Sequence, residues 1–120
     1  MSLGEKNINH FYANCHCNRI NILLPKKPDE ICDCYCNICS NIHRSKFTSF
    51  ARYSTSECGI KIGSKLFKKI RSSNYANRYL CAKCGQFIFM HYVNSPNIWF
   101  YTDTFQSDVT DVEHYDLYKN

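Results

Sequence analysis

The chain has 120 residues and a formal net charge of +5, and nine of its residues are cysteine. Its length predicts a single domain over residues 1–120, and no run approaches the roughly 20 apolar residues of a membrane helix, so we expect no membrane partner. An odd number of cysteines and the lack of an apolar stretch in residues 1–14 argue against a secreted disulfide framework. We therefore expect a reducing compartment, the cytoplasm, in which the cysteines remain thiols.

In chain order, the pattern of apolar and polar residues predicts mostly strands. Polar residues 1–9 lead into an aromatic and apolar segment at 11–24, and prolines mark a turn at 25–29. Strands are expected at 31–36, 47–53, 66–71, 86–93 and 98–102, and residues 37–44 can form a short helix. The tail from residue 103 is polar, with one more short strand near 113–118. The pattern indicates a mainly β fold of antiparallel strands, with a core at about residues 11–105.

The cysteines come in close groups, which are Cys15 and Cys17, then Cys34, Cys36 and Cys39, then Cys81 and Cys84, with Cys32 and Cys58 apart. The spacings C-x-C and C-x-x-C suit thiolates that converge on one metal ion, and cysteine-rich sites of this kind favour zinc. The sequence therefore predicts zinc binding rather than disulfides.

Two of the groups predict a structural zinc site. Gly85 follows Cys81 and Cys84 and lets the backbone bend back behind them. A C-x-C pair on a strand places both side chains on one face, so Cys15 and Cys17 are the expected partners. Four thiolates would close a tetrahedral site with Zn–S distances of about 2.3 Å. Such a site would close a long loop and stabilise a small domain.

The middle group, Cys34, Cys36 and Cys39, offers three thiolates in six residues. Three protein ligands leave a fourth position for water or substrate, which is the general form of a catalytic zinc site. Cys32, on the same strand face, or His43 could instead be the fourth ligand and close the site. The remaining candidates are expected to be structural: Cys58 as a buried apolar residue, His16 at the surface or behind the ligands, and His10, His91 and His114 within the fold.

Three motifs follow one another along the chain: C-x-C at 15–17, C-x-C-x-x-C at 34–39 and R-x-ϕ-C-x-x-C-G at 78–85, where ϕ is apolar. Their order resembles the signature of the glutathione-dependent formaldehyde-activating enzyme family and of its relative centromere protein V. The resemblance implies a β-tent fold of small antiparallel sheets and two zinc ions. It implies that Cys15, Cys17, Cys81 and Cys84 hold the structural zinc. It also implies that Cys34, Cys36 and Cys39 hold the second zinc, near which glutathione binds.

The family resemblance also implies a reaction. Formaldehyde and glutathione join to form S-hydroxymethylglutathione, and the enzymes are classed as carbon–sulfur lyases. Two features depart from the family pattern near the expected substrate pocket: Ser40 and Asn41 follow Cys39 where basic residues are usual, and Arg44-Ser45 replaces a Gly-Ala pair.

Three functions compete at this point. The first is a zinc-dependent lyase that acts on a glutathione adduct or a similar small thiol conjugate. The second is a non-catalytic, zinc-stabilised binding module for a protein or nucleic-acid partner, because a fold alone does not define an activity. The third, nucleic-acid binding, draws on a basic segment with interleaved aromatics, namely Lys61, Lys65, Lys68, Lys69, Arg71 and Arg78 with Phe67, Tyr75 and Tyr79. We prefer to interpret that segment as a solvated strand face, since two zinc–thiolate sites would lower the net charge to about +2.

Overall fold

The computed structural model describes residues 11–24, 26–60, 62–105 and 112–117 of the chain. Its elements are β1 (Phe11–Asn14), β2 (Asn21–Leu24), β3 (Glu30–Cys34), α1 (Asn37–His43), β4 (Thr48–Ser54), α2 (Thr55–Cys58), β5 (Phe67–Arg71), β6 (Ala76–Cys81), β7 (Phe87–Tyr92), β8 (Asn97–Tyr101), the 3-10 helix η2 (Thr102–Thr104) and β9 (His114–Leu117). The prediction of a mainly β fold is confirmed.

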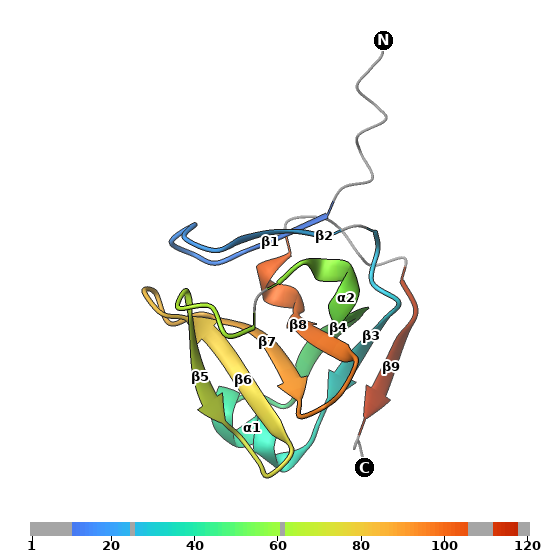
Figure 1. Cartoon of the computed structure of the whole chain (residues 1–120). Coiled ribbons are helices and arrows are strands. Elements are labelled where there is room, and N and C mark those ends of the chain that lie inside the picture. Colours follow the sequence, from blue (N-terminus) through green and yellow to red (C-terminus); the bar gives the residue numbers. More distant parts are fainter. Residues whose placement is uncertain (1–10, 25, 61, 106–111, 118–120) are drawn as a thin grey trace.

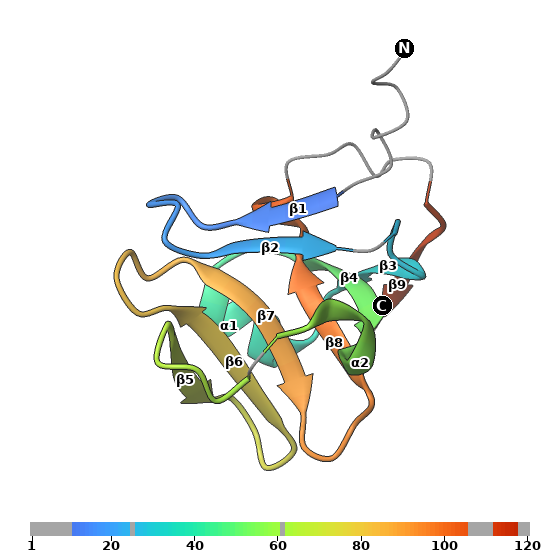
Figure 2. The ribbon, with the colours of Figure 1, turned by 45° about the horizontal axis from the view of Figure 1, so that its top comes forward.

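The strands form two sheets. A two-stranded hairpin, β1–β2, lies over one end of a seven-stranded sheet with the order β5-β6-β7-β8-β4-β3-β9 (Figures 1 and 2). All pairs are antiparallel except β3 with β9, which run parallel from Ile31 beside His114 to Cys34 beside Leu117. The short strand expected in the tail is present, and its parallel pairing differs from the antiparallel sheets that the family resemblance implies.

The core consists of two apolar clusters. The first joins the β1–β2 hairpin to the sheet through residues such as Leu24, Tyr53 and Phe100, and the second surrounds Phe50 and Tyr101. Burial of such large side chains is the main favourable term for a domain of this size. Strand β6 contributes to both clusters, because its side chains are buried on both faces.

Two local elements differ from the sequence prediction. The predicted strand at 31–36 ends at Cys34, because Cys36 is the N-cap of α1 and its sulfur accepts a hydrogen bond from the Cys39 amide at 3.3 Å. Helix α2 was not predicted, although Ser54 and Glu57 form a capping box at its start. That S-x-x-E signal was available in the sequence.

The basic segment does not form one continuous binding face. Lys68, Lys69 and Arg71 are exposed on the edge strand β5, while Arg78 is buried. Tyr79 is buried as well and stacks on Phe89, with ring centroids 4.5 Å apart, so it is not available to a nucleic-acid base. Lys61 lies outside the described residues. These positions fit the interpretation of β5 as a solvated strand face.

Candidate metal sites

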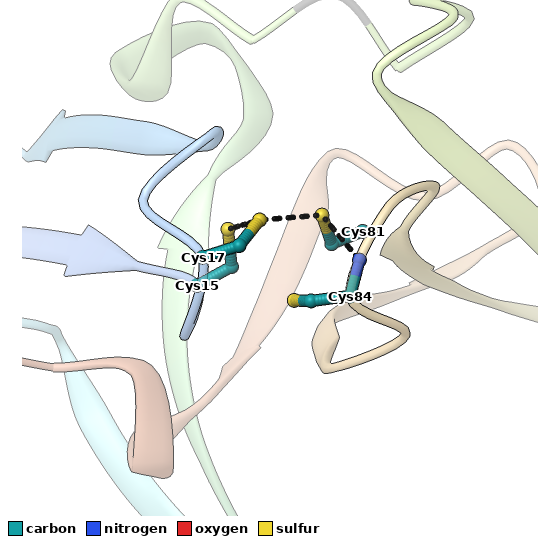
Figure 3. A group of neighbouring side chains, drawn as sticks. All are labelled: Cys15, Cys17, Cys81 and Cys84. Atoms are coloured by element: carbon teal, nitrogen blue, oxygen red, sulfur yellow. Dashed lines mark hydrogen bonds between the residues drawn. The ribbon is translucent and has the colours of Figure 1, made fainter.

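Cys15, Cys17, Cys81 and Cys84 come together although 64 residues separate the second from the third (Figure 3). Their sulfur atoms all lie within 4.8 Å of one another. The Cys15 and Cys17 sulfurs are 3.5 Å apart, and the Cys17 and Cys81 sulfurs are 3.7 Å apart. A tetrahedral zinc site with Zn–S bonds of about 2.3 Å needs sulfurs about 3.8 Å apart, so this donor set fits the ion.

The C-x-C pair lies in a turn and not on a strand, so the strand geometry expected for it was wrong. Strand β1 ends at Asn14, and the chain reverses before β2 with hydrogen bonds from the Asn18 amide to the Cys15 carbonyl and from the Cys15 amide to the Ile20 carbonyl. Asn18 has a φ of 62°, in the left-handed region that asparagine tolerates. The hairpin turn, rather than strand alternation, therefore points both sulfurs the same way.

Backbone amides surround the sulfurs of this first group. The Ile20 amide donates to the Cys15 sulfur at 3.2 Å, and the amides of Lys83 and Cys84 both donate to the Cys81 sulfur at 3.4 Å. Gly85 has a φ of +80° and donates its amide to the Cys81 carbonyl, which closes the turn as the sequence predicts. Donors aimed at sulfur favour the thiolate form that binds metal.

The two turns that carry the first group also bind each other directly. The His16 amide donates to the side-chain oxygen of Gln86 at 2.7 Å. The His16 side chain is exposed, as expected. A hydrogen bond from the Gln86 backbone is the main cause that lowers the pKa of Cys84, to about 6. Gln86 therefore supports both halves of the group, a role that no sequence motif indicated.

Cys34, Cys36 and Cys39 form the second group, with all sulfurs within 4.8 Å of one another. They come from the end of β3, the N-cap of α1 and its first turn. The Cys34 and Cys36 sulfurs are 3.4 Å apart. Cys34 and Cys39 are buried and Cys36 is half-buried, so the group faces the protein on one side and is reachable on the other.

A buried guanidinium lies against this second group. Arg78 is only 2% exposed, and its Nη2 donates to the Cys39 sulfur at 3.4 Å. The pKa of Cys39 is lowered to about 5, chiefly by a hydrogen bond from the Cys34 thiol and then by the hydrogen bond and charge of Arg78. The arrangement favours a thiolate at Cys39. The contact was not predicted, because Arg78 was expected on a basic strand face.

The two alternative fourth ligands lie outside the three-sulfur group. His43 Nε2 is 2.8 Å from the Tyr101 hydroxyl and accepts from Arg78 Nη1 at 3.2 Å. Because arginine only donates, Nε2 carries no proton in this arrangement, and burial followed by the charge of Arg78 lowers the pKa of His43 to about 4. Cys32 is buried beside the group, and burial raises the pKa of its thiol to about 12.

The second group opens onto a cavity of about 440 Å³, whose apolar walls are Ile38, Tyr75, Ala76, Met90 and Tyr92. A larger cleft of about 870 Å³ lies on the other side of His43 and Tyr101, beside Lys46 and Asp103. Its described lining includes no cysteine of either group. Of the two spaces, the smaller is therefore the one lined by cysteines of a candidate metal group.

The other histidine and cysteine candidates have separate surroundings. Cys58 is buried at the end of α2, where its thiol donates to the Ser54 carbonyl, and it belongs to neither group. The His91 ring contacts the Ser95 carbonyl at 3.0 Å, and His114 is exposed on β9. His10 lies outside the described residues.

The fold and the two groups define a mainly β protein that could bind metal ions, with sulfur donors suited to zinc, at two places. The sequence model of the glutathione-dependent formaldehyde-activating enzyme matches residues 10–111, and the chain belongs to this family. No curated protein sequence matches the chain. Among solved structures, a crystal structure of a Rhodobacter sphaeroides protein resembles it with a TM-score of 0.63 and 15% sequence identity, over 87% of this chain and 99% of that chain. That likeness supports the fold.

None of the described helices is long and apolar enough to span a membrane.

Proposed function

We propose that the chain is a zinc-dependent carbon–sulfur lyase that acts on S-hydroxymethylglutathione or a similar small thiol conjugate, in either direction. The observation that carries the proposal is the group of Cys34, Cys36 and Cys39, which opens onto a cavity. Among the described residues no fourth histidine, cysteine, aspartate or glutamate joins the three sulfurs. Three protein ligands with access from solvent are the general form of a catalytic zinc site. Cys15, Cys17, Cys81 and Cys84 would hold a second, structural zinc.

Zinc, Cys39 and Arg78 would each contribute to the chemistry of the second group. Zinc bound there would supply Lewis acidity, which polarises an oxygen or lowers the pKa of a bound thiol. The hydrogen bond from Cys34, and then the hydrogen bond and charge of Arg78, favour a thiolate at Cys39 before metal binds. Once zinc is bound, Cys34 would have no proton to donate, so the Arg78 contact is the one that remains. Arg78 also donates to the Tyr101 hydroxyl at 2.8 Å, and this network holds the guanidinium in place. Its positive charge offsets the net −1 of a zinc ion with three thiolates.

The reaction balances without an added oxidant or reductant. In the synthetic direction the thiol sulfur attacks the carbonyl carbon of formaldehyde, a carbon–sulfur bond forms, and the thiol proton passes to the oxygen. In the reverse direction the hydroxyl proton leaves, the carbon–sulfur bond breaks and the sulfur regains a proton. The reaction needs a site that orients the thiol and stabilises charge on sulfur or oxygen. Bound zinc would supply that stabilisation, and the buried Arg78 would hold Cys39 in place as one of its ligands.

Exchange spectroscopy with ¹³C-labelled formaldehyde tests the proposal, because it measures interconversion with the thiol adduct at equilibrium. The zinc-loaded protein should accelerate the exchange above the uncatalysed rate with glutathione or another small thiol. Cys36→Ser removes a member of the group and should abolish the acceleration. Cys32→Ser, on the same strand as Cys34 but outside the group, should retain it. No acceleration with any thiol tested, or full activity in Cys36→Ser, would refute the proposal.

A further inference from the structure

We propose that the cavity over Cys34, Cys36 and Cys39 takes thiols with an aromatic or apolar skeleton, and their hydroxymethyl adducts, in preference to glutathione. This inference rests on the proposed function and narrows its substrate class. It follows from the apolar cavity walls, from the hydrogen bonds that already engage Ser72, Ser73 and both Nη atoms of Arg78, and from the exposed aromatic side chains at the cavity.

Apolar side chains dominate the space next to the second group. Ile38, Ala76 and Met90 line the cavity together with Tyr75 and Tyr92. Met90 is buried, while Tyr75 is 72% exposed and Tyr92 is 40% exposed. A methionine sulfur and aromatic faces make favourable contacts with an aromatic ring. The wall therefore suits a flat apolar group attached to the reacting sulfur.

Glutathione carries two carboxylates and one ammonium group, and the described lining has few charged side chains that could pair with them. Arg78 is the one charged side chain in that lining, and it is buried. Its Nη1 and Nη2 are directed at Tyr101, His43 and Cys39, and only its Nε has no hydrogen-bond partner. Its charge already offsets the thiolates. A carboxylate that entered the cavity would lose hydration without gaining a cation, which is unfavourable.

The two serine side chains at the cavity are occupied by the turn before β6. The Ser72 hydroxyl donates to the Ala76 carbonyl, and the Ser73 hydroxyl accepts from the amides of Tyr75 and Ala76. Arg71, the cation next to this turn, donates to the carbonyls of Ser73 and Asn74. The charged ends of glutathione would therefore remain in solvent and add little to its affinity.

Cobalt(II) in place of zinc gives a direct test, because a thiol that joins the group changes the sulfur-to-cobalt absorption. The cobalt-loaded protein is titrated with benzyl mercaptan and, separately, with glutathione. Burial of one aromatic ring predicts that benzyl mercaptan binds about 10- to 100-fold more tightly. Tyr75→Ser should weaken benzyl mercaptan by about 2- to 10-fold and leave glutathione unchanged. Tyr12→Ser, an exposed tyrosine on the β1–β2 hairpin, is the matched control and should alter neither titration.

The outcomes separate the inference from the proposed function. If glutathione binds as tightly as benzyl mercaptan or more tightly, the inference is wrong and the thiol site stands. An equal affinity for benzyl mercaptan in Tyr75→Ser and the parent protein also overturns it. If neither thiol changes the cobalt spectrum, no thiol joins the metal group and the inference is wrong, while the formaldehyde exchange assay decides the proposed function separately.

Discussion

Arg78→Met tests how much the buried guanidinium supports the second cysteine group. Methionine keeps an unbranched side chain of similar length but removes the charge and all the donors. Arg78 donates to the Cys39 sulfur, to the Tyr101 hydroxyl and to His43 Nε2. The substitution therefore affects a candidate metal ligand and two neutral acceptors, and these effects can be measured separately.

The neutral acceptors contribute to stability whether or not metal is bound. A net loss of about 1 kcal/mol for each hydrogen bond predicts a metal-independent cost of about 2 kcal/mol. The contact with Cys39 matters most when that residue is a thiolate ligand. Substitution of groups that support metal ligands lowers metal affinity by about 10- to 100-fold. Because Arg78 is charged and 2% exposed, we expect the upper end, about 100-fold or about 2.7 kcal/mol.

Two measurements separate these contributions. Native mass spectrometry during competition with a chelator follows the two metal equivalents, and urea unfolding of the zinc-loaded protein follows stability. Arg78→Met should release one equivalent at a lower chelator concentration and keep the other. Arg71→Met is the matched control, because Arg71 is exposed on β5 and donates to carbonyls of the adjacent turn. Its cost should stay below about 1 kcal/mol.

Arg78 would not support the second group if Arg78→Met bound both metal equivalents as tightly as the parent protein. Equal destabilisation by Arg78→Met and Arg71→Met would lead to the same conclusion, since the buried network would then contribute no more than a surface hydrogen bond.

Three further predictions address the other parts of the molecule. Cys81→Ser should lose one metal equivalent and unfold, because structural zinc contributes about 10–16 kcal/mol in small zinc peptides, while Cys58→Ser should keep both equivalents in native mass spectra. His43 has a pKa of about 4 in the folded protein, so it stays neutral at pH values where the unfolded chain already binds a proton. Its contribution to the free energy of unfolding, up to about 3 kcal/mol above pH 6.5, is therefore lost as the pH falls toward 4. His43→Gln should make the fall in stability over this range smaller. Parallel pH profiles of urea midpoints for the two proteins would contradict this. Gly85→Ala should lower the free energy of unfolding in urea by about 1–2 kcal/mol, because Gly85 has a φ of +80°. Gly63→Ala is the control, since a Cβ there also meets open space but the φ is not positive, and it should be near neutral. Equal costs for the two substitutions would exclude the backbone explanation.

Much of the fold could be predicted from local patterns. Alternation and turn residues located the strands now seen as β4, β5, β7 and β8, because these signals depend on neighbours in sequence. The parallel pairing of β9 with β3 could not be predicted, since it depends on contacts between residues more than 80 positions apart. The shift of register between β6 and β7 at Tyr79 and Leu80 is another feature that strand alternation does not encode.

The cysteine groups were easier to predict than their surroundings. Spacing alone indicated which sulfurs could share an ion, because ligand geometry limits how far apart they can lie. The backbone that positions them was harder: Cys15 and Cys17 use a hairpin turn, and Cys36 caps a helix. The partners of the ligands were missed, since neither Gln86 nor Arg78 carries a local signal for a contact with residues far away in sequence.

Strand geometry explains the spacing of Arg78 and Cys81 in the motif R-x-ϕ-C-x-x-C-G at 78–85. Successive side chains on a strand point to opposite faces, so residues three apart, such as Arg78 and Cys81 on β6, face opposite sides. Tyr79 and Cys81 accordingly pack in the first apolar cluster, whereas Ala76 packs in the second and Arg78 reaches Cys39 there. One strand thus delivers a thiolate to the first cysteine group and a guanidinium to the second. A slip of β6 by one residue would exchange its two faces, so the register that builds the first group also places the cation beside the second.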